Sequence, residues 1–133
     1  MSRKKILIVD DEELTLMMTE NILSREYDTV RALSGKEAIA LYSEHNPNLV
    51  LSDLMMPEMT GFEMLDVMHQ KYGRAIPVIF MTAHESEENE LRSLTSGAVD
   101  FIRKPLKADV LLKSVNSIMQ RLEAARQSGA FGK

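Results

Sequence analysis

Cysteine is absent from this chain of 133 residues. Without it the protein can form no disulfide framework, no thiol nucleophile and no Cys-ligated zinc site. Long apolar runs are absent as well, because no stretch approaches the roughly 20 apolar residues that span a bilayer. The apolar run that follows the N-terminal basic residues, Ile6–Val9, is too short for the core of a signal peptide. These absences predict a cytoplasmic protein that does not enter a membrane.

An excess of positive charge is also missing. The chain carries 20 acidic and 16 basic residues, for a formal net charge of −4 at pH 7. Because nucleic-acid binders present basic surfaces, this balance argues against direct binding of DNA or RNA. The length suits a single domain with a sizeable core, and 44% of the residues are hydrophobic.

Five short runs predict the strands of a sheet. The runs at 6–9 and 76–81 are apolar without alternation, which is typical of strands buried on both faces. The run at 27–31 carries charge, as an edge strand does. Further runs at 48–52 and 98–102 complete the set.

Helical patterns lie between and after these runs. Capping boxes begin helices at Ser34 and Thr60, each with Glu three residues later. An acidic helix is expected at 85–95, and the last helix at 107–126. A helix after Asp11 is expected to turn one apolar face toward the core, formed by Leu14, Met17, Met18 and Ile22. Strands that alternate with helices predict an α/β domain with a parallel sheet and right-handed crossovers.

Four of the predicted strands end on polar side chains of a reactive kind. These are Asp10 with Asp11, then Asp53, Thr82 and Lys104. Because the carboxyl ends of parallel strands meet at one edge of a sheet, we expect the side chains to converge there. Each has a structural interpretation by itself: Asp53 or Thr82 as a cap, the acidic pair as a first helical turn, Lys104 as a surface lysine. Their joint occurrence favours a site.

The charges of these residues indicate what the site would hold. Three carboxylates at close range repel one another and raise at least one pKa. A divalent cation and Lys104 would bring the total charge to zero. Oxygen ligands without His or Cys favour Mg2+, and such a site would suit a phosphoryl group attacked by one of the carboxylates.

These motifs resemble those of the receiver domain of two-component response regulators. The resemblance rests on Val9-Asp10-Asp11-Glu12, on Ser52-Asp53-Leu54-Met55-Met56-Pro57 with Gly61, on Thr82-Ala83 and on Lys104-Pro105, and it covers about Lys4 to Leu122. It implies a doubly wound, flavodoxin-like sheet of five parallel strands in the order 2-1-3-4-5, with five helices. We expect a receiver domain at 4–125 and a C-terminal tail or linker at 126–133.

The resemblance also implies roles for the residues at the sheet edge. Asp53 would be the phosphoacceptor. Asp10 and Asp11 would hold Mg2+ together with Asp53 and the backbone carbonyl of Met55. Lys104 would pair with the phosphoryl oxygens.

Three further residues receive roles by the same resemblance. Thr82 would donate a hydrogen bond to the phosphoryl group, and Phe101 would be the aromatic switch that moves with it. The peptide bond between Lys104 and Pro105 would be cis.

The function implied is a phosphorylation-dependent switch rather than a metabolic enzyme. A sensor histidine kinase or a histidine phosphotransfer protein would donate to Asp53. The altered face, formed by the helix at 85–95, the strand at 98–102 and the helix at 107–126, would bind an effector or act on a linked output domain. A homodimer through that face is also compatible with the family.

Three other functions compete with this interpretation. A Mg2+-dependent phosphatase would need a second carboxylate two residues beyond its nucleophile, where Met55 stands. A flavodoxin-like cofactor binder would need a phosphate-binding loop after the first strand, where acidic residues would repel phosphate. A pure interaction module would lack Mg2+ binding.

Overall fold

The computed structural model describes residues 3–73, 76–83 and 97–127. Within these residues the strands are β1 (Lys5–Val9), β2 (Asp28–Ala32), β3 (Leu49–Asp53), β4 (Val78–Thr82) and β5 (Asp100–Arg103). The helices are α1 (Glu13–Leu23), α2 (Gly35–His45), α3 (Gly61–Tyr72) and α5 (Ala108–Gln127). The acidic helix predicted at 85–95 lies outside the described residues.

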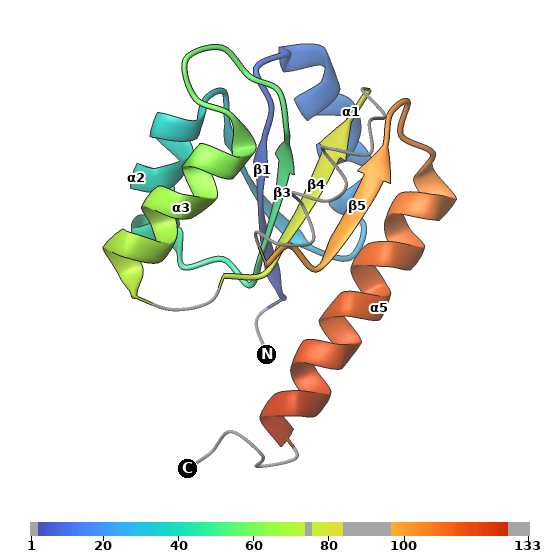
Figure 1. The fold of residues 1–133 in the computed structure, drawn as a ribbon. Coiled ribbons are helices and arrows are strands. Elements are labelled where there is room, and N and C mark those ends of the chain that lie inside the picture. The colour runs from blue at the N-terminus through green and yellow to red at the C-terminus, as the bar shows by residue number, and fades with distance from the viewer. Residues whose placement is uncertain (1–2, 74–75, 84–96, 128–133) are drawn as a thin grey trace.

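The five strands form one parallel sheet in the order β2-β1-β3-β4-β5, which confirms the predicted topology. In the central pairings Val9 lies opposite Ser52, and Asp53 lies opposite Met81. All strands therefore point in one direction and end at one edge of the sheet, the upper edge in Figure 1.

Side chains that alternate along the strands divide the core into two layers. Residues such as Leu7, Val50 and Val78 pack against α2 and α3, and residues such as Ile6, Leu51 and Ile79 pack against α1 and α5. Around β1, β3 and β4 both layers are closed to solvent, which is why the runs of these three strands are mainly apolar without alternation. The two pairs of helices lie on opposite sides of the sheet in Figure 1.

The helix boundaries follow the chemistry of their ends. Ser34 caps α2 by accepting a hydrogen bond from the Glu37 amide, and Thr60 and Glu63 form a complete capping box on α3. Gly73 ends α3 in the left-handed conformation, at φ 64°. The last helix, α5, continues to Gln127, one residue beyond the end predicted for it. No helix among the described residues has the length and apolarity that a bilayer crossing requires.

The buried face of α1 differs from the prediction. Leu14, Met17 and Met18 are 68%, 52% and 56% exposed, whereas the buried positions are Leu16, Thr19 and Leu23. Of the four predicted residues, Ile22 is partly buried and packs against the core. Two apolar stripes overlap in this helix, and the stripe that contains Thr19 is the one buried against the sheet. The Thr19 hydroxyl can be buried there because it donates to the carbonyl of Thr15.

The observed orientation of α1 predicts unequal effects for two neighbouring substitutions. Leu16→Ala should lower the free energy of unfolding by about 2–4 kcal/mol, because it empties a fully buried position. Met17→Ala should change it by less than about 0.5 kcal/mol, because Met17 is 52% exposed and lies outside the core. Urea unfolding of both variants measures the difference, and equal losses would contradict the observed orientation of α1.

Candidate functional site

Four strands deliver the predicted site residues to the same edge of the sheet. Asp10 directly follows β1, Asp53 and Thr82 are the last residues of β3 and β4, and Lys104 directly follows β5. Backbone hydrogen bonds continue the sheet past these ends, from the Leu54 amide to Met81 and from the Lys104 amide to Thr82, both at 2.8 Å. The side chains therefore start from fixed backbone positions.

Lys104 joins the two buried carboxylates of the site. Its ammonium nitrogen lies 2.8 Å from Asp10 Oδ2 and 3.5 Å from Asp53 Oδ1. Asp10 is fully buried and Asp53 is 7% exposed, so both ion pairs are largely shielded from solvent. The other oxygen of Asp10 accepts a hydrogen bond from the Glu12 amide at 3.0 Å. One cation thus faces two buried anions.

The excess of negative charge appears in the pKa of Asp53. Burial, which is the largest cause, and the charges of Asp10 and Asp11 together raise that pKa from 3.8 to about 6, although the charge and hydrogen bond of Lys104 lower it. Burial by itself would lower the pKa of Lys104, but its hydrogen bond to Asp10 and the charges of Asp53 and Asp10 raise it. The ammonium therefore stays charged at neutral pH, and the carboxylates remain under-compensated.

The oxygens of this cluster fit a divalent cation. Asp10, Asp11 and Asp53 each offer a carboxylate oxygen, and these atoms lie within 4.8 Å of one another. Asp11 is exposed, which leaves the cluster open to solvent on one side. A hard oxygen donor set with an open side is the arrangement in which proteins bind Mg2+ while it keeps several waters. The chain can therefore hold a metal between these three residues.

Two hydrogen bonds fix the backbone at and just after Asp53, and the sequence motifs did not predict them. The buried hydroxyl of Ser52 donates to the carbonyl of Asp53 at 2.9 Å. The Gly61 amide donates to the carbonyl of Leu54 at 2.8 Å and so fixes the start of α3 beside the end of β3. For Ser52 the sequence offered only adjacency to Asp53 as a signal.

The remaining predicted residues lie on β4 and β5 and in the loops that follow β3 and β5. Met55 lies in the loop after β3, with a side chain that is 49% exposed. Thr82 is fully buried at the end of β4. The peptide bond between Lys104 and Pro105 is cis. Phe101 lies on β5 opposite Phe80 and packs, half-buried, against the core layer of α2 and α3.

The raised pKa of Asp53 predicts a pH-dependent gain in stability for Asp53→Asn. The folded state binds the Asp53 proton more tightly than the unfolded state, so the wild type loses stability as pH rises from about 4 to about 6. Asn carries no charge, and the variant should therefore be more stable by about 1–3 kcal/mol at pH 7 and equal to the wild type near pH 3. Urea unfolding in chelator at both pH values tests this. Asp66→Asn, which alters an exposed carboxylate on α3, is the control.

The contact between α3 and β3 predicts a strong effect for Gly61→Ala. A Cβ at Gly61 would lie 2.7 Å from Phe80 Cε1 and 2.9 Å from the Asp53 carbonyl oxygen. We expect a loss of about 1–3 kcal/mol in the free energy of unfolding, because ring and backbone must both shift. Gly35→Ala is the matched control at the first residue of α2, since the atom it meets is the flexible end of Met59. Equal losses in the two variants would show that the close approach at Asp53 has no special cost.

Comparison with known proteins places the chain in one family. Residues 6–116 match the family model described as the response regulator receiver domain. A solved CheY-like receiver domain protein from Methanospirillum hungatei superposes with a TM-score of 0.86 at 33% identity, over 93% of this chain and 99% of that one. The receiver domain of the Francisella response regulator 1452 gives a TM-score of 0.81 at 32% identity, over 90% of this chain and 98% of that one.

Curated relatives include both short and long proteins. The polar-differentiation response regulator DivK of Brucella ovis is 32% identical over 118 residues, which are 87% of this chain and 96% of DivK. PhoP of Bacillus subtilis, an alkaline phosphatase synthesis transcriptional regulatory protein, is 32% identical over 126 residues, which are 94% of this chain and 52% of PhoP. The chain spans about half or less of the length of several such relatives. With its fold, its acidic cluster and Lys104 at the sheet edge, the chain belongs to the receiver domains of two-component response regulators.

Proposed function

We propose that this protein is a phosphorylation-dependent switch in which Asp53 accepts a phosphoryl group from a phosphohistidine. The observation that carries the proposal is the placement of Lys104, whose ammonium lies 2.8 Å from Asp10 and 3.5 Å from Asp53. Because the Lys104 ammonium already contacts both buried carboxylates, it can bind phosphoryl oxygens at Asp53 without a large movement. The ammonium contacts only one oxygen of Asp53, Oδ1, so the carboxylate retains an oxygen for attack on phosphorus.

The chemistry requires the transfer of one phosphoryl group. An oxygen of Asp53 attacks phosphorus, a P–O bond forms, and the P–N bond to the donor imidazole breaks while the nitrogen keeps the electron pair. Mg2+ held by Asp10, Asp11, Asp53 and the Met55 carbonyl would neutralise the charge that accumulates in this step. Lys104 would bind the phosphoryl oxygens, and the Thr82 hydroxyl would donate to one of them.

The change at Asp53 would reach the surface through β4 and β5. A phosphoryl group adds negative charge and strong acceptor oxygens beside Thr82 and Lys104. A contact that differs between two arrangements of this region shifts their populations. We assign Phe101 as the aromatic that reports the shift, because it lies on β5 two residues before Arg103, the residue that pairs with Thr82.

The partners follow from this reaction. A sensor histidine kinase or a histidine phosphotransfer protein would supply the phosphohistidine. An effector or a linked output domain would bind the altered face, to which we assign β5, α5 and the acidic helix predicted at 85–95. We assign residues 4–125 to the receiver unit and 126–133 to a tail, and a homodimer through the same face is compatible with the role.

The phosphoacceptor assignment predicts one adduct that depends on Mg2+ and on Asp53. Intact mass is measured after incubation with acetyl phosphate or with phosphoramidate, whose P–N bond imitates phosphohistidine. Wild type and Asp66→Asn should each gain a single base-labile phosphoryl group with Mg2+ and none with chelator, and Asp53→Asn should gain none. An adduct of unchanged yield in Asp53→Asn would contradict the assignment, and so would a folded wild type that binds Mg2+ but reacts with neither donor.

A further inference from the structure

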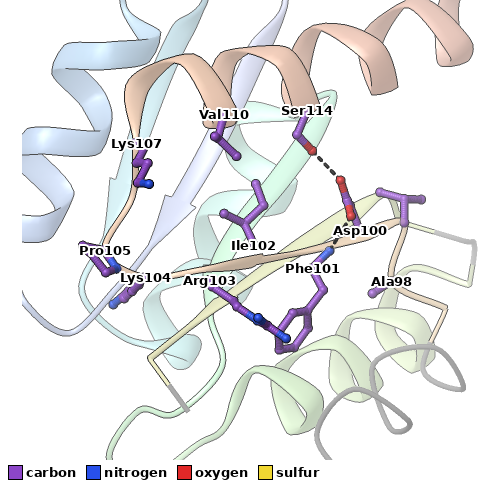
Figure 2. A pocket seen from close by; sticks show the side chains of 11 residues that line it. Ala98, Asp100, Phe101, Ile102, Arg103, Lys104, Pro105, Lys107, Val110 and Ser114 are labelled. Atoms are coloured by element: carbon purple, nitrogen blue, oxygen red, sulfur yellow. Dashed lines mark hydrogen bonds between the residues drawn. The ribbon is translucent and has the colours of Figure 1, made fainter. Parts of the chain in front are cut away.

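One carboxylate outside the acidic cluster contacts both β5 and α5. Asp100, the first residue of β5, accepts a hydrogen bond from the Phe101 amide on Oδ1 at 2.8 Å. Its second oxygen, Oδ2, accepts a hydrogen bond from the hydroxyl of Ser114 on α5. Figure 2 shows both bonds, with Asp100 between the strand and the helix. The two residues form what we term the Asp100–Ser114 clasp.

The strand end of the clasp is the weakly anchored one. β5 lies at the edge of the sheet and contains four residues, of which Asp100 and Arg103 are exposed. An edge strand has a partner on one side, so its outward amides need other acceptors. The Asp100 carboxylate provides the acceptor for the Phe101 amide. The backbone position of Phe101 therefore depends in part on where this carboxylate points.

The helix end of the clasp is rigid by comparison. Ser114 precedes Val115, which is fully buried, and Leu111 and Ile118 on the same face are buried as well. These side chains pack in the core layer that also contains Ile102 of β5. The Ser114 hydroxyl is therefore a fixed donor that holds the Asp100 carboxylate in place.

The clasp also lies where a partner would contact the domain. It forms part of the wall of a hollow of about 750 Å³ between β5 and the start of α5, which Figure 2 shows from close by. Val99 and Val110 are 39% and 49% exposed at this hollow. A change in the clasp therefore changes the shape of this surface.

We propose that Asp100 and Ser114 are positioning residues that couple the backbone of Phe101 to α5. The proposal rests on the proposed function in so far as Phe101 is the switch residue. When Phe101 moves, its amide must either leave the Asp100 carboxylate or carry it along. In the first case the bridge breaks and α5 does not follow, and in the second the movement reaches α5. We assign the second case, in which the Asp100 carboxylate stays bonded to both partners and the strand and helix respond together.

The first test uses the unphosphorylated full chain. Amide hydrogen exchange at Phe101 is followed by NMR in wild type, Ser114→Ala, Ser114→Thr and Ser117→Ala. Loss of the Ser114 hydroxyl should accelerate exchange at Phe101 about three- to tenfold, the effect of one lost hydrogen bond to a partly exposed carboxylate. Thr restores the donor and should restore protection. Ser117 is the matched control, because it lies exposed on the same helix and, among the described residues, makes no side-chain hydrogen bond to β5.

The second test adds Mg2+ and acetyl phosphate. Ser114→Ala should form the same phosphoryl adduct as wild type, since Ser114 lies outside the acidic cluster. In wild type the amide shifts should change along both β5 and α5, and in Ser114→Ala along β5 alone. Unchanged exchange at Phe101 in Ser114→Ala, or an α5 response equal to that of wild type, would overturn the proposal. Absence of any adduct in wild type would refute the phosphoacceptor role. The hydrogen-exchange measurement on the unphosphorylated chain would still test the Asp100–Ser114 clasp.

Discussion

The structure depends on an unequal number of charges at the carboxyl edge of its sheet. Asp10 and Asp53 are buried there and share one ammonium, that of Lys104, while Asp11 adds a third carboxylate at the solvent side. Buried charges that lack compensation are costly, and the raised pKa of Asp53 expresses that cost. In the proposed function a divalent cation held by the three carboxylates would remove the imbalance, and a phosphoryl group at Asp53 would lie near the metal, the Lys104 ammonium and the Thr82 hydroxyl. The uncompensated negative charge of the resting protein would therefore favour binding of the cation.

The rest of the fold fixes the positions of these charged residues and determines which element can move when the charge at the site changes. β3, which carries Asp53, is buried along its whole length, and Ser52 and Gly61 hold its end from behind. β5, at the sheet edge, is short and partly exposed. Local stability is lower where fewer groups are buried, so a change at the site can move β5 more easily than β3. The proposed phosphoacceptor Asp53 and the strand proposed to respond, β5, accordingly lie on elements of different rigidity.

Sequence patterns predicted the features that depend on chemistry close to the chain. The sheet strands, the Ser34 cap, the Thr60 capping box and the polar strand ends were readable because buried strands and helix starts demand particular residue types. The second predicted capping box is incomplete, because the Glu37 side chain accepts from the Leu33 amide instead of the Ser34 amide. The prediction of which face of α1 is buried was wrong for Leu14 and Met17. In the sequence these residues form as good an apolar stripe as Leu16 and Leu23, and only packing against the sheet determines which stripe is buried. The Asp100–Ser114 clasp was not foreseen. Its partners are 14 residues apart on different elements, and nothing local marks either one.

Binding of Mg2+ at the carboxylate cluster tests the central claim most directly. Amide shifts of wild type and Asp11→Asn are followed by NMR during a Mg2+ titration, with Asp66→Asn as an exposed control. The account predicts saturable shifts at the ends of β1 and β3 in wild type and in the control, and an affinity at least about tenfold weaker in Asp11→Asn, since a ligand and a charge are lost. Equal affinity in Asp11→Asn, or shifts spread over acidic surfaces elsewhere, would contradict the account.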